Sequence, residues 1–310
     1  MSLTHEPRPL AAPATLSAAG SARERPKRRP GAGGFNTLSR RALITRYVLL
    51  VIVLAVSVGP LLWELSTSLK SVAEDVYSTT PNLLPKHPTL SNYTKVANTI
   101  PVWHFAENSL LVAFLNVGGN IIGATIAGFA LARLEFRGKK LVFGLFLATL
   151  VLPAEVTIIS QFQTIVSLGF GNSLIGVALP AMISTLNVLL MRNAFMAIPP
   201  EIDAAAVIDG ATVLQRLRYI GLPAVKGTIS IVAILAFIGA WDDFLWPLLV
   251  LQSPDKLTLT VGLSYLQSTF SVDPRTIAAG AMIALIPIIV LFVALQRFFF
   301  KGVGEGAVKG

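Results

Sequence analysis

Six long runs of apolar residues constrain the fold of this chain more than any other feature of its sequence. Each run is long enough to cross a hydrocarbon core about 30 Å thick as a helix that rises 1.5 Å per residue. Backbone polar groups in lipid must be satisfied within their own segment, which favours helices, and the alternating strands of a membrane β-barrel do not occur. We therefore predict an all-α, polytopic membrane protein with six transmembrane helices. The runs are 47–69, 107–133, 141–162, 173–196, 229–252 and 276–300.

The composition agrees with a membrane protein and excludes several other classes. Hydrophobic residues make up 54% of the chain and charged residues 13%, whereas a soluble domain carries about 25% charged residues. There is no cysteine, which excludes a disulfide framework, cysteine zinc sites and thiol catalysis. The net charge is +9, but the basic residues flank the apolar runs and form no soluble basic face, so we expect a lipid bilayer as partner and no nucleic acid.

The basic residues also predict an orientation. With the N-terminus inside, 20 of the 25 Lys and Arg residues fall on the inner side, and only Lys70, Lys86, Lys95, Lys256 and Arg275 lie outside. Positive residues are retained on the cytoplasmic side of a membrane. Both termini are therefore predicted to be cytoplasmic, which agrees with an even number of spans.

The remaining segments divide the chain into three parts. Residues 1–42 are rich in Pro, Ala, Gly, Ser and Arg, and we expect a disordered, basic cytoplasmic tail, too long for the n-region of a signal peptide. The transmembrane domain then covers 43–300. A Gly-rich cytoplasmic tail, 301–310, ends the chain. A long loop between the first two spans, 70–103, lies outside and is large enough to touch a partner.

The inner loop 197–227 is predicted to be helical rather than flexible. Pro199 and Pro200 favour a helix start, and Glu201 and Asp203 suit the positive end of the helix dipole. The run Ala204, Ala205 and Ala206 has the highest helix propensity. Gly210 then interrupts this helix, and the apolar spacing of Leu214, Leu217 and Ile220 indicates a second one. A short helix, a bend and a second helix should therefore lie under the membrane.

The same loop resembles a motif of the permeases of binding-protein-dependent ABC importers, in which E-A-A, three residues, G, nine residues and I-x-L-P follow one another. The residues in register are Ala205, Ala206, Gly210, Ile220, Leu222 and Pro223, while Ala204 stands at the motif's Glu position. The string Ile208–Ala211, the Trp241–Phe244 segment and the ending Gly306–Gly310 are similar to the second permease subunit of the maltose-type carbohydrate branch.

This resemblance implies the type I ABC importer permease fold and a subunit without enzymatic activity in a bacterial cytoplasmic membrane. The implied partners are a second homologous permease, a dimer of cytoplasmic ATPase subunits and an external substrate-binding protein. The ATPase would bind Mg and hydrolyse ATP, and no cofactor would be bound by this chain. The substrate implied is an oligosaccharide or disaccharide, with a polyol phosphate such as glycerol-3-phosphate as the alternative.

The loop residues that we expect to couple the permease to the ATPase are the acidic residues of the loop and the residues of the motif. They are Glu201, Asp203, Ala204, Ala205, Ala206, Asp209, Gly210, Ile220, Leu222 and Pro223. The resemblance also implies a contact between the C-terminal tail and the ATPase, through Gly306, Ala307, Val308, Lys309 and Gly310. The alternative interpretations are a generic interfacial helix for the loop and a merely flexible end for the tail.

Charged residues within membrane spans are costly and are candidates for function. The candidates for the translocation path are Glu155, Asn187, Trp241, Asp242, Asp243, Phe244 and Trp246. Acids beside aromatic faces suit a sugar path, and the 242–246 segment would line or gate its outer half. Hydrogen bonding between helices is the alternative role for these polar residues, above all for Asn116, Asn120 and Asn187.

Two other functional classes are less consistent with the sequence. An ion-coupled secondary transporter usually has internal repeats, which we do not detect. An intramembrane enzyme could use Glu155 with Asp242 and Asp243, but no nucleophile, phosphate-loop or metal motif accompanies them. The three histidines lack the spacing of metal ligands.

Overall fold

The structure is a computed structural model that describes residues 40–78, 82–268 and 273–307. Most of the predicted tail 1–42 therefore lies outside the described residues, and its last three residues belong to the first helix. The chain divides into two units, residues 1–55 and 56–310. The described part of the first unit is helical, and its apolar side chains are exposed, as suits contact with lipid or another apolar surface.

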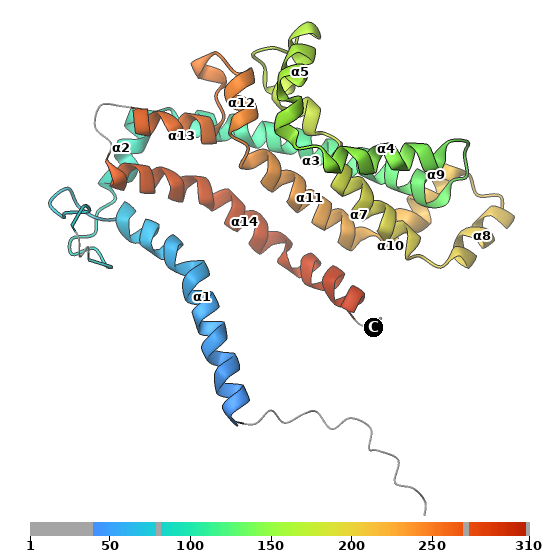
Figure 1. Cartoon of the computed structure of the whole chain (residues 1–310), viewed down its shortest axis with the longest axis horizontal. Helices are drawn as coiled ribbons and strands as arrows, with labels where there is room; N and C mark the ends of the chain where they lie inside the picture. The colour runs from blue at the N-terminus through green and yellow to red at the C-terminus, as the bar shows by residue number, and fades with distance from the viewer. Residues whose placement is uncertain (1–39, 79–81, 269–272, 308–310) are drawn as a thin grey trace, which may run out of the picture. The chain divides into compact units, whose positions relative to one another are not determined.

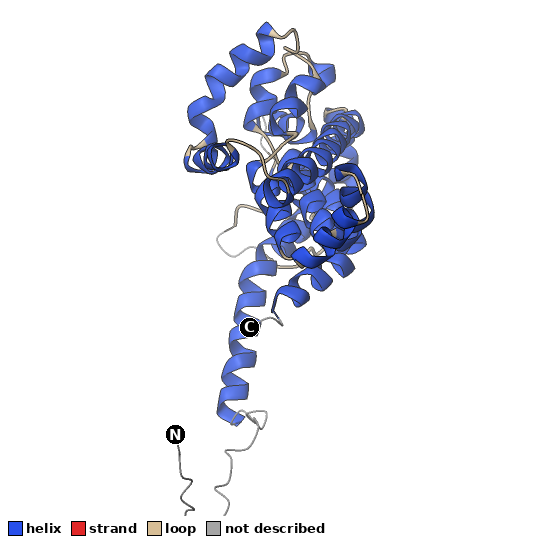
Figure 2. Ribbon diagram, turned by 90° about the vertical axis from the view of Figure 1, so that its right-hand side faces the viewer, coloured by secondary structure: helices blue, strands red, loops and turns tan. Residues whose placement is uncertain are grey.

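The described residues contain helices and no strand, as Figure 2 shows. Figure 1 gives the labels and the course of the chain. The α-helices are α1 (Arg40–Ser68), α2 (Ser91–Thr99), α3 (Val102–Arg133), α4 (Lys139–Val151), α5 (Ala154–Ser167), α6 (Leu174–Ala178), α7 (Thr185–Met196), α8 (Pro200–Ile208), α9 (Val213–Gln215), α10 (Leu222–Ala224), α11 (Lys226–Trp241), α12 (Leu245–Val250), α13 (Leu259–Ser268) and α14 (Pro274–Ala307). Three short turns complete them: η1 (Leu179–Ala181), the π-helical η2 (Arg216–Gly221) and η3 (Pro254–Lys256).

Only half of the six predicted spans are single helices. Within the described residues, α1, α3 and α14 are long and apolar enough to cross a membrane, and the total reaches six if each of three bent pairs counts as one span. The pairs are α4 with α5, bent by 111°, η1 and α6 with α7, bent by 44°, and the α9–α10 segment with α11, bent by 81°. Pro153 at the first bend lacks the N–H that a continuous helix needs.

The fifth predicted span, 229–252, differs most from the structure. Its helix α11 ends at Trp241, and Asp242 is the C-cap residue. A short break follows, and the chain resumes as α12 at Leu245. Asp242 and Asp243 therefore do not lie on a continuous helix as the sequence pattern suggested. The last helix also differs, because α14 continues as helix to Ala307 rather than ending at Phe300.

Helix α3 is the centre of the second unit. It packs along α7 and α11, so segments distant in sequence lie side by side (Figure 1). Two apolar clusters form along it. The first surrounds the N-terminal half, with Phe105, Val112 and Trp241 among its buried residues. The second surrounds the C-terminal half, where the Phe129 and Phe195 rings meet edge to face with centroids 5.3 Å apart.

One buried asparagine on α3 forms hydrogen bonds with backbone groups that are free at the break between η1 and α7. The Asn120 amide donates to Ala181 O at 2.8 Å, and its carbonyl oxygen accepts from Ser184 N at 2.9 Å. The same oxygen accepts from Asn187 Nδ2 at 2.9 Å. Backbone groups freed by a break inside a membrane need such partners. Asn120 and Asn187 therefore make the hydrogen bonds between helices that we considered as the alternative to a role in the translocation path.

Small residues let α3 approach its neighbours closely. A Cβ added at Gly128 would lie 2.7 Å from Met191 Cβ and 2.8 Å from Arg192 N, so the α7 backbone itself would have to move. A Cβ at Gly118, on the same helix, would meet nothing within 4 Å. The two glycines thus differ in packing although both lie within one helix.

We expect Gly128→Ala to destabilise the protein and Gly118→Ala to leave its stability unchanged or slightly raised. Overpacking of this kind costs about 1–3 kcal/mol, whereas alanine in an open helical position favours the helix. Thermal unfolding of the detergent-solubilised protein measures both. Equal melting temperatures for the two variants would contradict the α3–α7 packing.

Candidate functional site

The inner loop is built from two short helical segments with well-defined ends. Helix α8 begins at Pro200, and Glu201 and Asp203 lie in its first turn. It ends in a Schellman motif, because Gly210 N donates to Val207 O at 3.1 Å and Ala211 N donates to Ala206 O at 2.9 Å. Gly210 has a φ of +77°, the left-handed conformation that favours glycine. The predicted helix and bend are confirmed.

The second segment begins immediately after the bend. Thr212 caps it through a capping box with Gln215, in which each side chain binds the other residue's backbone N–H. The segment then runs through α9, the π-helical turn η2 and α10, and so contains the Ile220, Leu222 and Pro223 of the motif. Gly221 is buried in this turn, and a Cβ there would lie 3.1 Å from the Phe195 ring.

An ion pair joins the two segments. Arg216 Nε donates to Asp203 Oδ1 at 2.8 Å, and its NH2 group donates to Asp203 Oδ2. The two side chains are only 11% and 17% exposed, so this bidentate pair is largely protected from water. Asp203, expected to favour the helix dipole and to take part in coupling, also holds α8 against η2. Sequence reasoning missed Arg216, which lies 13 residues away and carries no motif.

A second arginine fixes the base of the loop. Arg133, the last residue of α3, donates from Nε to Phe195 O at 3.1 Å and from NH2 to Ile198 O. These carbonyls lie at the end of α7, directly before Pro199. A cation here adds hydrogen bonds to carbonyls at the helix end and suits the negative end of the helix dipole. The central helix α3 is thus tied to the inner loop, which the sequence pattern did not indicate.

The loop presents an apolar surface away from the rest of the chain. The large apolar side chains that are at least half exposed are Val207, Ile208, Leu214 and Tyr219. Ile208 has the most exposed side chain of this group, at 86%. By contrast, Ala206 is buried, while Ala204 and Ala205 are exposed. Exposed apolar side chains on a braced element are typical of a surface that contacts another protein.

Two pockets lie on either side of the break between α11 and α12. One, of ≈ 570 Å³, is lined by Trp241, Asp242, Phe244 and residues of α13 and α14. The other, of ≈ 330 Å³, is lined by Asp243, Trp246, Glu155 and Gln161 among others. All the predicted path residues except Asn187 therefore line one of two neighbouring pockets.

Hydrogen bonds fix the break itself. Thr260 Oγ1 donates to Asp243 O at 2.8 Å. The indole N–H of Trp241 donates to Ala284 O at 3.0 Å, and that of Trp246 donates to Val177 O at 3.1 Å. The break is therefore a defined structure, with both indole N–H groups already paired.

The remaining predicted site residues are placed as follows. Asp209 is the C-cap residue of α8. Gly306 and Ala307 belong to the backbone of α14, and Val308, Lys309 and Gly310 lie outside the described residues. In the part of the chain that the structure describes, no group of three or more His, Asp or Glu side chains is arranged to hold a metal ion.

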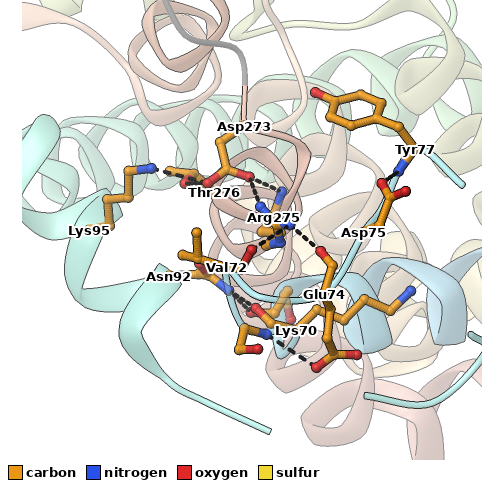
Figure 3. A network of polar contacts seen from close by, with 12 residues as sticks. Lys70, Val72, Glu74, Asp75, Tyr77, Asn92, Lys95, Asp273, Arg275 and Thr276 are labelled. Carbon is orange, nitrogen blue, oxygen red and sulfur yellow. Dashed lines mark hydrogen bonds and ion pairs between the residues drawn. The ribbon is translucent and has the colours of Figure 1, made fainter. Parts of the chain in front are cut away.

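At the opposite end of α3 from the inner loop, a polar network anchors the loop that was predicted to lie outside (Figure 3). Asn92 of α2 donates to Ser68 O and Lys70 O at 2.8 and 2.9 Å. Arg275, at the start of α14, donates to Glu74 O and, at 3.2 Å, to Asp273. Lys95 also pairs with Asp273 at 3.1 Å. The long loop is therefore held to both α2 and α14.

Two carboxylates of this network have lowered pKa values. The backbone N–H of Lys86 lowers the pKa of Glu74 most, with help from His87 and Ser71 and against the effect of burial. Burial acts to raise the pKa of Asp273, but hydrogen bonds from Lys95 and the Arg275 backbone outweigh it, so this pKa is lowered too. Both groups therefore stabilise the network in their ionised form.

These features define a class: a polytopic helical membrane protein whose central helix has a braced loop at one end and an anchored loop at the other. Residues 119–305 match the family model of the binding-protein-dependent transport system inner membrane component. The chain belongs to this family.

Curated relatives and a solved structure agree with this assignment. The arabinooligosaccharide transport permease of Halalkalibacterium halodurans is 32% identical over 73% of this chain and 81% of its own length. The galactooligosaccharide permease of Bacillus subtilis is 30% identical over 86% and 96%, and the sn-glycerol-3-phosphate permease of Salmonella typhi is 32% identical over 73% and 84%. A chain of a bacterial alginate ABC transporter, 23% identical, shares the fold with a TM-score of 0.74 over 86% of this chain and all of its own.

The anchored loop should loosen only in acid. A carboxylate with a lowered pKa contributes its full stabilisation above its ordinary pKa, which is about 4, and loses it as the pH falls through the lowered value. We therefore expect a spin label at Asn82→Cys, in this cysteine-free chain, to keep its mobility from pH 7 to about 5 and to become mobile below about 4. In a Glu74→Gln, Asp273→Asn background the label should already be mobile at pH 7. A transition near pH 6 would contradict the two lowered pKa values.

Breaking the Arg216–Asp203 pair should release α8. Hydrogen bonds to charged groups contribute about 1.5–3 kcal/mol, so Arg216→Gln should speed hydrogen exchange of the α8 amides by about tenfold or more. Arg218→Gln is the matched control, because Arg218 is exposed on the same turn. If both variants left α8 exchange unchanged, the ion pair would not brace the loop.

Proposed function

We propose that this chain is the permease subunit of an ATP-driven importer that moves a sugar across the bacterial cytoplasmic membrane. A second homologous permease completes the pathway, an external binding protein delivers the sugar, and a dimer of ATPase subunits in the cytoplasm binds Mg and hydrolyses ATP. Both termini are cytoplasmic, as the distribution of Lys and Arg favours. The chain itself has no enzymatic activity and binds no cofactor.

The inner loop carries this proposal. Its motif and family membership point to coupling, and its construction supplies what coupling needs mechanically. A movement of the ATPase can act on the membrane helices only through an element that does not yield. The Asp203–Arg216 pair and the Schellman motif stiffen the loop, and Arg133 links its base to the central helix α3. The exposed Ile208 and Leu214 provide apolar surface for the ATPase.

Ala204 stands where the motif has Glu, so the carboxylate that the motif supplies must come from a neighbouring acid. Asp203 is committed to Arg216, whereas Glu201 lies exposed in the first turn of α8. A carboxylate at Glu201 can therefore meet a basic group of the ATPase, while Ala204 allows close approach. In the C-terminal tail, Gly306–Gly310 is the second segment that we assign to contact with the ATPase.

The sugar assignment rests on the relatives and on the pockets at the α11–α12 break. Several relatives are permeases for oligosaccharides, and one is a permease for sn-glycerol-3-phosphate. Trp241, Phe244 and Trp246 offer aromatic faces, and Asp242, Asp243 and Glu155 offer hydrogen-bond acceptors. These are the groups that bind the apolar faces and the hydroxyls of a sugar. Asn187 serves the packing of α3 and α7 instead.

Gly210→Val should uncouple the transporter. A β-branched residue at a positive φ costs about 1–2 kcal/mol or more and distorts the bend. Gly138→Val is a matched control, since Gly138 has a φ of +84° in another loop and is equally uncrowded. In nanodiscs that hold the complete complex, we expect Gly210→Val to lower the ATP hydrolysis stimulated by the loaded binding protein by about tenfold, while the subunits stay assembled. If the two variants behaved alike, the bend would have no special part in coupling.

A further inference from the structure

Three pockets lie in the second unit, and two of them share residues. Gln161 and Pro180 line both the ≈ 330 Å³ pocket that contains Glu155 and Asp243 and a ≈ 340 Å³ pocket formed by the polar side of α5. Asp243 lines the ≈ 330 Å³ pocket, and the preceding residue, Asp242, lines the ≈ 570 Å³ pocket. The polar side of α5 thus extends the predicted path beyond the residues that the sequence indicated.

The charges in these pockets are all of one sign. Glu155, Asp242 and Asp243 are the charged residues among those that line the three pockets, and no Lys or Arg lines any of them in the described part of the chain. The other lining residues are apolar or are neutral hydrogen-bonding residues such as Gln161, Thr164 and Ser264.

Three basic residues on the predicted outer side, Lys95, Lys256 and Arg275, are paired with other groups. Lys256 Nζ donates to Asn172 O at 3.0 Å, and Lys95 pairs with Asp273. Arg275 is bound to Asp273 and to backbone carbonyls of the anchored loop. Each of these cations would have to leave a partner before it could meet an anion in the pockets.

An anionic substrate would be strongly disfavoured here. Moving a charge out of water is costly unless an opposite charge accompanies it, and nearby like charges add repulsion. Sugar hydroxyls have no such penalty, because they donate hydrogen bonds to carboxylates and amides. The indole N–H groups of Trp241 and Trp246 are paired with backbone carbonyls, so these residues present ring faces rather than donors.

We propose that this chain's side of the pathway selects an uncharged, hydroxyl-rich sugar and rejects phosphate- or carboxylate-bearing ones, with Gln161 and Thr164 of α5 as further path residues. This inference rests on the proposed function and decides between its two substrate classes. Glu155 and Asp243 make the pathway disfavour anions, because both negative charges line the same pocket.

The test measures the electrostatic potential in the pathway, and its result does not depend on the specificity of the binding protein. Gln161→Cys is made in the full-length chain, which has no other cysteine, and the chain is assembled with cysteine-free partner subunits in nanodiscs. The thiol is reacted, during ATP turnover, with cationic and anionic thiosulfonates of similar size, and their rates are divided by those with free mercaptoethanol. Ser160→Cys, on the wall of the α5 pocket, serves as a second probe if the first variant does not assemble.

We expect the cationic reagent to react about tenfold faster than the anionic one after this correction, as one or two negative charges within several ångströms predict. In the Glu155→Gln, Asp243→Asn background the ratio should fall towards one. A ratio of one or less in the native background, or a thiol that neither reagent reaches, would overturn the inference. The proposed function is judged separately, by whether the same complex hydrolyses ATP in response to its loaded binding protein.

Discussion

Satisfying the backbone where membrane helices break is the constraint on which the rest of this structure depends. Each break frees N–H and C=O groups that lipid cannot satisfy, and at several of them a polar side chain from a distant segment supplies a partner. Asn120 closes the break before α7, and Arg133 closes the end of α7. Asn172 does the same after α12, where its carbonyl oxygen accepts from Gln252 N and Ser253 N. These residues tie the helices to one another.

The breaks are also where the surfaces that we propose to be functional form. The end of α7 leads directly into the inner loop, so the arginine that completes this helix also orients the loop. The break at Asp242 opens pockets on both of its sides, because the chain leaves its helical course there. A continuous helix would have sent adjacent aspartates about 100° apart. The break instead gives each of them its own pocket, and so provides two polar surfaces from two consecutive residues.

The two ends of α3 hold different kinds of structure. At the inner end, short helices held by one ion pair form a braced projection with exposed apolar side chains. At the other end, Arg275 and Asn92 anchor a long loop through buried hydrogen bonds, and Lys95 adds an ion pair at the surface. A permease that receives a partner on each side of the membrane needs both surfaces to be held by its central helix, and α3 spans the distance between them.

The sequence by itself determined the class, the approximate positions of the six spans and the helix, bend and helix of the inner loop, because apolar length, proline, glycine and helix propensity act over a few neighbouring residues. Only the tertiary structure decided where the spans break, which of the polar residues pair, and which line a pocket. Asn187 and Asp243 look alike in sequence, as polar residues within apolar runs. One is paired across two helices and the other faces a pocket, since burial and hydrogen bonding depend on neighbours about 60 or more residues away.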